Sequence, residues 1–256
     1  MKLSKKTKNL LKFVKLKKER LFLFFDYDGV LVPLQNNPAT AYLPSKVKKG
    51  LLELSFKKNI KVALVSGRNL HLLKKLTKLR SKNITLIGSH GLEMYYKGTT
   101  KHIFDKNLKD LKSIKKEATK LAKDIASGFV ENKPYSFTYH IRDKKKNDFV
   151  QKICSAVNSL IKKRGLSKKL KVLKGKKMVE ILPCDVNKGS AVEKLISLSP
   201  KYKYVYFGDD VTDISAFKIV NKYKGIPVSL NKKLPYKTKY TLNLPADVWN
   251  FIYNLN

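Results

Sequence analysis

Two aspartates separated by one residue follow an unbroken apolar run near the start of the chain. The run is Leu21–Phe25, and Asp26, Tyr27, Asp28 and Gly29 come directly after it. An apolar run of this length is typical of a strand buried on both faces, as in a parallel sheet covered by helices. Ligands of such sheets bind beyond the carboxyl ends of the strands. Two carboxylates at that place require protons or a cation nearby; the alternative is an acidic turn that closes a strand.

Polar groups with complementary chemistry flank other predicted elements. Ser66 follows a second predicted strand, Asp209 follows a fourth one, and Asp213 lies four residues further on, while Lys188 begins a predicted helix. Cleavage of a phosphate ester needs an in-line nucleophile, a proton for the leaving alkoxide and positive charge on the phosphoryl oxygens. We therefore predict that these residues form a phosphoryl-transfer site.

The residue types suit the separate tasks of such a site. A carboxylate can act as the nucleophile and form an aspartyl phosphate, and a second carboxylate two residues on can act as the acid and then as the base for water. Ser66 and Lys188 can hold phosphoryl oxygens by hydrogen bond and charge. Because clustered carboxylates repel a phosphate dianion unless a divalent cation lies between them, the sequence also predicts a Mg²⁺ site.

Simpler explanations exist for three of these residues. Ser66 could cap the helix that follows it. Lys188 could be a solvated lysine, and Asp213 could be a carboxylate that stabilises a helix N-terminus.

The elements that would position these residues alternate regularly. Predicted strands at 21–25, 61–65 and 84–87 are separated by predicted helices at 45–57 and 69–79. This order is typical of a doubly wound, mostly parallel sheet. A basic segment at residues 3–20 precedes them, with apolar residues near helical spacing, and we predict an amphipathic helix there; a helix lying on a membrane surface is the alternative.

The order changes to helix, two strands, helix and two strands between residues 104 and 183, which indicates a smaller α+β lobe with an antiparallel sheet. The first pattern then resumes with predicted helices at 188–197, 213–223 and 245–253 and strands at 204–207 and 225–228. We predict an α/β core formed by residues 1–103 and 184–256, interrupted by an α+β cap at 104–183.

The charge balance is strongly basic. Lysine and arginine number 56 against 19 aspartates and glutamates, a formal net charge of +37 in 256 residues. Such an excess suggests nucleic-acid or anionic-membrane binding, but the lysines are spread along the whole chain rather than gathered in one block. We therefore expect no dedicated nucleic-acid partner. We expect instead that the positive field of the protein attracts an anionic substrate.

The remaining bulk features indicate a cytoplasmic protein. Two cysteines, Cys154 and Cys184, give no disulfide framework and are typical of a reducing compartment. No signal peptide is evident, and no apolar stretch approaches the roughly 20 residues that a membrane span needs.

Four motifs occur in the order found in haloacid-dehalogenase-superfamily phosphatases. They are DYDGVL at 26–31, VSGR at 65–68, a lysine before a helix at 188, and GDDVTD at 208–213. Within that superfamily the chain resembles trehalose-6-phosphate phosphatases in GSHGLE at 88–93, VENKPYSFTYHIR at 130–142, GKKMVEILP at 175–183 and NKGSAV at 187–192. The resemblance extends from about Leu21 to Phe217.

The resemblance implies roles for the matched core residues. Asp26 would be the nucleophile and a metal ligand, and Asp28 the general acid and base, with its carbonyl also on Mg²⁺. Ser66 and Lys188 would bind phosphate. Asp209 would be a further Mg²⁺ ligand, and Asp213 would complete this acidic metal site by orienting Lys188 or a metal-bound water.

The resemblance also implies that the cap closes over a sugar and excludes water. Glu131 and Lys133 could instead form a surface pair, and so could Lys176 and Glu180. Polar side chains of this kind suit a ligand rich in hydroxyl groups. The residues expected to bind the substrate are Arg68, His90, Glu131, Lys133, His140, Arg142, Lys176 and Glu180.

Three positions depart from the family pattern. Val30 stands where a threonine is usual, Ile214 and Ser215 replace an acidic continuation, and Ile141 replaces an aromatic residue. None of these changes removes a predicted catalytic group. They leave the substrate less defined than the reaction.

We therefore predict a Mg²⁺-dependent phosphatase that converts trehalose 6-phosphate to trehalose and phosphate, acts as a monomer and works with a separate trehalose-phosphate synthase. One alternative is a phosphatase for another phosphorylated disaccharide or glycoside, such as sucrose phosphate or glucosylglycerol phosphate. A second is a nucleic-acid-binding protein on the same scaffold, which would show steeply salt-dependent affinity and no turnover. A third is a catalytically silent partner of a synthase.

Overall fold

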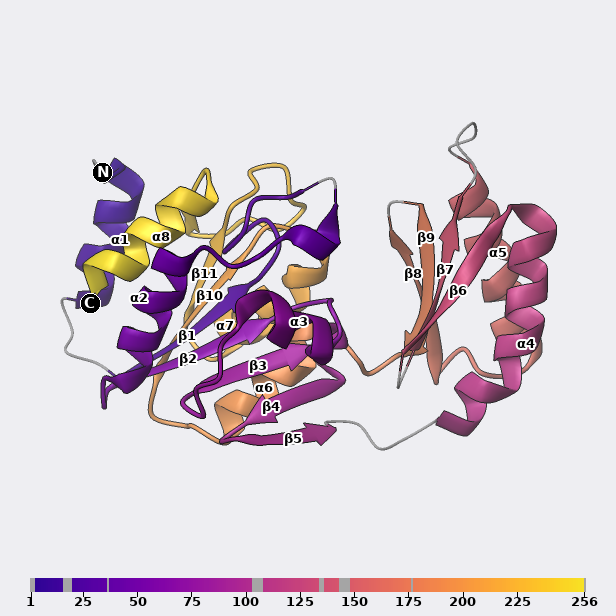
Figure 1. The fold of residues 1–256 in the computed structure, drawn as a ribbon, viewed down its shortest axis with the longest axis horizontal. Coiled ribbons are helices and arrows are strands. Elements are labelled where there is room, and N and C mark those ends of the chain that lie inside the picture. Colours follow the sequence, from indigo (N-terminus) through magenta and orange to yellow (C-terminus); the bar gives the residue numbers. More distant parts are fainter. Residues whose placement is uncertain are drawn as a thin grey trace. The chain divides into compact units, whose positions relative to one another are not determined.

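The computed structural model describes residues 3–15, 20–35, 37–102, 108–133, 136–142, 148–175 and 177–255. The chain divides into two compact units, and each has its own sheet (Figure 1). Residues 1–103 and 187–256 form what we call the core unit, and residues 104–186 form the cap unit.

An eight-stranded sheet forms the centre of the core unit, with the strand order β12-β11-β10-β1-β2-β3-β4-β5. Its strands pair in parallel from β12 to β3, and β4 and β5 are antiparallel. The strands are β1 (Leu21–Asp26), β2 (Ile60–Val65), β3 (Ile84–Gly88), β4 (Glu93–Tyr96), β5 (Thr99–His102), β10 (Lys203–Gly208), β11 (Ile226–Ser229) and β12 (Tyr240–Thr241).

Helices cover both faces of this sheet (Figure 1). Leu21, Leu23 and Phe25 of β1 belong to the apolar cluster on one face, whereas Phe22 and Phe24 belong to the cluster on the other. This double burial explains the continuous apolar run, and it confirms the predicted doubly wound, mostly parallel sheet. The first face carries α1 (Lys5–Lys15), α2 (Ser45–Phe56), α3 (Leu70–Thr77) and α8 (Pro245–Leu255), and the second carries α6 (Lys188–Ser197) and α7 (Ile214–Lys222).

The basic helix α1 is part of the core. Leu10, Leu11 and Val14 are buried in the main apolar cluster, and the hydroxyl of Thr7 donates a hydrogen bond to Asp247 of α8 at 3.3 Å. Because the apolar side of α1 is already covered by protein, the alternative of a helix lying on a membrane surface is wrong. The described helix ends at Lys15, and residues 16–19 of the predicted helix lie outside the described residues. Within the described part of the chain, we find no helix with the length and hydropathy of a membrane span.

The hairpin β4–β5 adds two antiparallel strands at one edge of the core sheet. No strand is predicted there from the sequence. The strands are only four residues long, and Thr99 to His102 are polar, so neither shows an apolar run or a clear alternation. Lys97 and Gly98 form the turn with left-handed φ values of 50° and 87°, which suits a two-residue hairpin turn.

The cap unit has a four-stranded antiparallel sheet with the order β6-β7-β9-β8. Phe137, Tyr139 and Ile181 lie on the face packed against the helices. The alternate positions of the same strands, including Thr138 and Glu180, share the opposite, polar face. The elements are α4 (Leu108–Ile125), β6 (Gly128–Lys133), β7 (Ser136–Ile141), α5 (Phe149–Lys163), β8 (Leu170–Gly175) and β9 (Met178–Pro183).

Candidate active site

Three neighbouring strands end at one edge of the core sheet. β1 lies between β10 and β2 and pairs with both in parallel. β1 ends at Asp26, Ser66 follows β2, and Asp209 follows β10. Lys188, the first residue of α6, and Asp213, which precedes α7, join them at this edge. The carboxyl edge of a parallel sheet is where ligands bind in doubly wound folds.

Lys188 lies between two buried carboxylates. Its Nζ is 2.8 Å from Oδ2 of Asp26 and donates a hydrogen bond to Oδ1 of Asp213 at 2.7 Å. The side chains of Lys188 and Asp213 are 3% and 0% exposed. Asn187 fixes the start of α6, because its side chain accepts a hydrogen bond from the backbone N–H of Ser190 at 2.9 Å. The alternative of a solvated Lys188 is therefore wrong.

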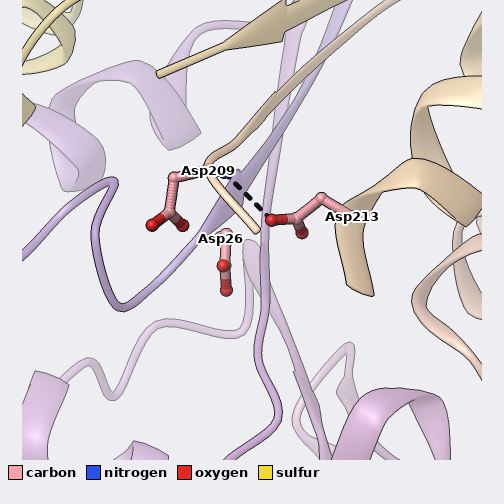
Figure 2. Close-up of side chains that lie close together, drawn as sticks. All are labelled: Asp26, Asp209 and Asp213. Atoms are coloured by element: carbon pink, nitrogen blue, oxygen red, sulfur yellow. Dashed lines mark hydrogen bonds between the residues drawn. The ribbon is translucent and has the colours of Figure 1, made fainter. Parts of the chain in front are cut away.

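Asp213 is the most fully hydrogen-bonded group of the cluster. Its Oδ1 accepts a second hydrogen bond from the hydroxyl of Tyr206 at 2.7 Å. Its Oδ2 accepts from the backbone N–H groups of Asp209 and Asp210, both at 3.0 Å. Figure 2 shows the Asp209 contact and the carboxylate of Asp26 beside the other two. Asp213 therefore anchors both Lys188 and the turn that follows β10.

Burial and charge act together on the pKa values of these groups. Burial raises the pKa of Asp26 well above its ordinary value, and the charges of Asp213 and Asp209 raise it further while Lys188 opposes them. Burial, aided by the charge of Asp213, raises the pKa of Asp209 to about 7. Burial works in the same direction on Asp213, but the charge and hydrogen bond of Lys188 hold the pKa of that carboxyl below its ordinary value.

The same balance applies to the cation. Burial disfavours the charged form of Lys188, but the two carboxylates raise its pKa above the ordinary value. One ammonium group thus faces the three carboxyl groups of Asp26, Asp209 and Asp213, and the cluster retains an excess of negative charge when all are ionised.

This cluster fits a divalent cation. One oxygen from each of Asp26, Asp209 and Asp213 lies within 4.8 Å of the others. Oδ1 of Asp209 is buried without a hydrogen-bond partner among the described residues. Gly29 leaves space beside it, since a Cβ at that position, where φ is 77°, would collide with the Asp209 carboxylate. Clustered carboxylate oxygens with an unsatisfied lone pair are the ligands that Mg²⁺ prefers.

Asp28 and Arg68 form a fork-like ion pair. Nε and Nη2 of Arg68 each donate a hydrogen bond of 2.7 Å to one oxygen of Asp28. Nη1 of Arg68 donates to the carbonyl of Pro38, also at 2.7 Å. The Asp28 side chain is 32% exposed, in contrast to that of Asp26. The residue predicted to bind substrate, Arg68, here contacts the predicted acid, and the bidentate geometry fixes the direction of that carboxylate.

Ser66 does not cap the helix that follows it. Its hydroxyl oxygen accepts a hydrogen bond from the backbone N–H of Arg68 at 3.1 Å, and its side chain is buried. The cap of α3 is Asn69, whose side chain accepts from the backbone N–H of Leu72 at 2.8 Å. His90 approaches the same loop, since its N–H donates to the carbonyl of Ser66 at 3.0 Å.

Two charge pairs lie on the polar face of the cap sheet. Nζ of Lys133 is 3.1 Å from Oε1 of Glu180, and both side chains are buried. The hydroxyl of Ser136 donates to the same oxygen at 2.7 Å. Nε2 of His140 lies 2.8 Å from Oε2 of Glu131. The alternative of a Glu131–Lys133 surface pair is wrong, because each residue has a different partner.

An aromatic stack continues this face. The ring of Phe129 lies 4.9 Å from that of His140 at an interplanar angle of 15°. The guanidinium carbon of Arg142 lies 5.0 Å from the centre of the Phe129 ring. Lys176, another predicted substrate-binding residue, lies outside the described residues.

Three contributors to these clusters are not singled out in the sequence. Tyr206 reads as an ordinary strand aromatic, yet its hydroxyl contacts Asp213. Ser136 and Phe129 give no signal of their own. Strand pairing supplies the only clue, because Phe129 lies opposite His140 and Ser136 opposite Lys133 in the β6–β7 register.

Comparisons with known proteins identify relatives of this chain. The family model for trehalose-phosphatase matches residues 24–245. The probable trehalose-phosphate phosphatase J of Arabidopsis thaliana is 30% identical over 264 residues, which cover 93% of this chain and 67% of that protein. The trehalose-6-phosphate phosphatase of Escherichia coli (strain K12) is 26% identical over 232 residues, which cover 90% of this chain and 84% of that protein.

Solved structures share the fold. The C-terminal domain of Candida albicans trehalose-6-phosphate phosphatase aligns with a TM-score of 0.79 at 24% identity, over 100% of this chain and 98% of that one. The C-terminal domain of the Candida albicans trehalose synthase regulatory protein aligns with a TM-score of 0.72 at 15% identity, over 98% of each chain. The structural likeness supports the haloacid-dehalogenase-like fold, and the family model identifies its type. This chain belongs to the trehalose-phosphatase family, and it is a phosphatase.

Proposed function

We propose that this protein hydrolyses trehalose 6-phosphate to trehalose and phosphate, with Mg²⁺ as its cofactor. The observation that carries the proposal is the buried Lys188 held between Asp26 and Asp213, beside a third carboxylate, at the carboxyl edge of the sheet. The substrate is taken from the names of the relatives, two of which are described as trehalose phosphatases above.

Asp26 is the proposed nucleophile. Its carboxylate oxygen attacks the phosphorus, and the bond from phosphorus to the sugar oxygen breaks as Asp28 gives that oxygen a proton. The products of this step are trehalose and an aspartyl phosphate at Asp26. A water molecule then attacks the phosphorus and gives its proton to Asp28, and the bond to Asp26 breaks to release phosphate.

Lys188 and Ser66 are the proposed phosphate-binding groups. Lys188 contributes positive charge next to Asp26, and Ser66 contributes a hydroxyl from the neighbouring strand end. Uncatalysed phosphate-ester hydrolysis is so slow that the site must lower the barrier by on the order of 20 kcal/mol. Preorganised charge and in-line placement are the main sources of such a reduction in phosphoryl transfer.

Asp26, Asp209 and the backbone carbonyl of Asp28 are the proposed Mg²⁺ ligands. When bound, Mg²⁺ neutralises the carboxylates and polarises the phosphoryl oxygens. Asp213 has both oxygens engaged by Lys188, Tyr206 and two backbone N–H groups, so we assign it to orienting Lys188 and the Asp209 turn.

Arg68 is proposed to orient the acid. Its fork-like contact holds Asp28 in one rotamer, which favours a fixed direction of proton transfer.

The polar face of the cap sheet is the proposed site for the sugar. The pairs Lys133–Glu180 and Glu131–His140 offer charged donors and acceptors that suit hydroxyl groups. Arg142 and Lys176 are proposed to belong to the same sugar-binding set, and His90 of the core unit is proposed to contact the substrate. We further propose a cytoplasmic monomer whose substrate is supplied by a separate trehalose-phosphate synthase.

The test is phosphate release from trehalose 6-phosphate by the wild type and by Asp26→Asn, each with Mg²⁺ and with EDTA. Glucose 6-phosphate, sucrose 6-phosphate and p-nitrophenyl phosphate complete the panel. We expect turnover that favours trehalose 6-phosphate and disappears with EDTA or with Asp26→Asn. Preference for another sugar phosphate would contradict the proposed substrate, and activity retained by Asp26→Asn would contradict the proposed role of Asp26 as the nucleophile.

A cap variant tests the sugar site separately. Glu180→Gln should raise KM for trehalose 6-phosphate and leave kcat/KM for p-nitrophenyl phosphate unchanged. Glu117→Gln is the matched control, because Glu117 lies on α4 of the same unit and its side chain, which pairs with Arg164, is 41% exposed. An equal effect of Glu180→Gln on both substrates would contradict a sugar-binding role.

A further inference from the structure

The segment Gly88–Glu93, which reads GSHGLE, contains a turn in an unusual backbone conformation. Ser89 and His90 have left-handed φ values of 50° and 55°. Non-glycine residues seldom adopt this conformation, because Cβ approaches the following carbonyl oxygen. Two such residues in succession require contacts that hold them in place.

Glu93 provides one of these contacts. It is the first residue of β4, and its carboxylate is buried. Oε2 of Glu93 accepts a hydrogen bond from the hydroxyl of Ser89 at 2.7 Å and another from the backbone N–H of Leu70 at 3.1 Å. Leu70 is the first residue of α3, whose initial N–H groups have no partner within the helix. One carboxylate therefore joins the turn to the start of α3.

The turn held in this way lies directly against the loop that follows β2. The N–H of Ser89 donates to the carbonyl of Arg68 at 2.7 Å, and the N–H of His90 donates to the carbonyl of Ser66 at 3.0 Å. The His90 ring packs on Gly67, where an added Cβ would lie 2.6 Å from its Cε1 atom. The positions of Ser66 and Arg68 thus depend on the turn.

The other end of the turn contacts the segment that carries Lys188. A Cβ on Gly91, where φ is 115°, would lie 2.9 Å from the carbonyl oxygen of Asn187. Asn187 caps α6 immediately before Lys188. The turn therefore lies between the two loops that contribute the proposed phosphate-binding groups, and it approaches both so closely that glycine is required at each contact.

We propose that Glu93 is a positioning residue for phosphoryl transfer. Its carboxylate fixes the Ser89–His90 turn, and the turn in its place sets the spacing of Ser66, Arg68 and Lys188. The inference rests on the roles proposed above for these residues. Displacements of about 1 Å at a reacting centre can reduce turnover by about 100-fold, so a loosened turn should affect the chemical step for every substrate, whatever group the phosphate is attached to.

The test compares Ser89→Ala, Glu93→Gln, Glu93→Ala and the double variant Ser89→Ala/Glu93→Ala with the wild type. Glu53→Gln is the matched control, because Glu53 is an exposed glutamate on α2. The measurements are kcat and KM for trehalose 6-phosphate and p-nitrophenyl phosphate, the Kd of orthovanadate as a phosphate-shaped anion, and urea unfolding to show that each variant is folded.

We expect Glu93→Ala to lower kcat by on the order of 10-fold or more, by the same factor for both substrates, and to weaken vanadate binding. Glu93→Gln keeps an acceptor oxygen and should restore part of the loss. The double variant should be no worse than Glu93→Ala, since both changes remove the same contact. If Glu93→Ala does not fold, Ser89→Ala and Glu93→Gln give the answer through the same measurements.

Three results would overturn the proposal. They are a kcat and a vanadate Kd within twofold of the wild type in all folded variants, a loss confined to trehalose 6-phosphate, and fully additive effects of the two substitutions. A wild type that hydrolyses only p-nitrophenyl phosphate would contradict the proposed substrate, while the comparison of variants on that ester would still decide the role of Glu93. If the wild type shows no turnover on either substrate, the vanadate Kd values of the variants would still decide the role of Glu93.

Discussion

Replacing Lys188 by methionine should destabilise the metal-free protein strongly. Methionine has a similar length but no charge, so the substitution leaves the buried carboxylates of Asp26 and Asp213 without their shared partner. At contact distances of 2.8 and 2.7 Å, each attraction amounts to about 6 kcal/mol at an effective dielectric constant of about 20.

In the wild type, the cost of burying the ammonium group offsets most of this attraction. The variant has neither the attraction nor that cost. Removing one partner of a buried ion pair costs about 3–5 kcal/mol in measured cases. Because Asp26 can take up a proton once Lys188 is gone, we expect a value near the lower end, about 3 kcal/mol in the free energy of unfolding at pH 7.

The effect should depend on pH in a defined direction. Lys188 holds the pKa of Asp213 below its ordinary value, so Asp213 contributes stability above the unfolded pKa of about 3.9 that is lost as the pH falls through the folded value. This contribution is present throughout the range from pH 4 to pH 8. In the variant, burial without a compensating cation should raise the pKa values of Asp213 and Asp26, so the cost of ionising them grows as the pH rises above about 3.9. The difference between wild type and Lys188→Met should therefore be largest above pH 7 and decrease toward pH 4.

Urea unfolding in EDTA, followed by the fluorescence of Trp249, measures this difference at pH 8, 6 and 4. Lys194→Met is the matched control, because Lys194 is an exposed residue of the same helix, α6. We expect the control to lie within about 0.5 kcal/mol of the wild type. A Lys188→Met variant as stable as this control, or a deficit that grows on acidification, would refute the electrostatic argument.

Three further substitutions probe the same site. Asp209→Asn should stabilise the metal-free protein by about 1–2 kcal/mol above pH 7 and less toward pH 4, because burial raises the folded pKa of Asp209 to about 7. Urea unfolding measures this gain. If Mg²⁺ stabilises the variant as much as the wild type, the assignment of Asp209 as a metal ligand is contradicted. Gly29→Ala should cost at least about 1 kcal/mol and weaken Mg²⁺ binding, since φ is 77° and the Cβ would meet Asp209; thermal unfolding with and without Mg²⁺ tests both effects. Tyr206→Phe should cost about 1 kcal/mol by removing a donor from Asp213, and a neutral result in urea unfolding would show that this hydrogen bond adds nothing.

The fold class could be predicted because the signals are local. The run Leu21–Phe25 is apolar at every position, as the two apolar clusters on either side of β1 require. The order of the predicted elements along the chain then indicates which residues follow each strand. Parallel pairing brings Asp26, Ser66 and Asp209 to one edge of the sheet. Lys188 could be placed there because Asn187 and the apolar spacing that follows indicate a helix start.

The partners of these residues could not be predicted, because they depend on contacts distant in the sequence. Arg68 and Asp28 are 40 residues apart, and Lys133 and Glu180 are 47 residues apart. Neither pair has a local sequence pattern that identifies its two members as partners. The hairpin β4–β5 was missed for a different reason: its stability comes from pairing with β3 rather than from an apolar alternation of its own.

The sheet order of the core unit has a consequence for synthesis of the protein on the ribosome. Leu21 of β1 pairs with Lys203 of β10. The central strand β1 therefore cannot pair on this side until β10, which is translated much later, has left the ribosome. At translation rates of on the order of 5–20 residues per second, this delay lasts on the order of 10 s or longer. The cap unit, by contrast, is continuous from residue 104 to residue 186.

During this interval the apolar strand β1 has no partner on its β10 side, which makes the nascent chain a substrate for chaperones that shield apolar segments. Asp26 likewise has neither Lys188 nor Asp209 until both have left the ribosome. The carboxylate cluster therefore cannot form before Asp213 has left the ribosome, and a growing chain that ends within the cap contains no phosphatase site.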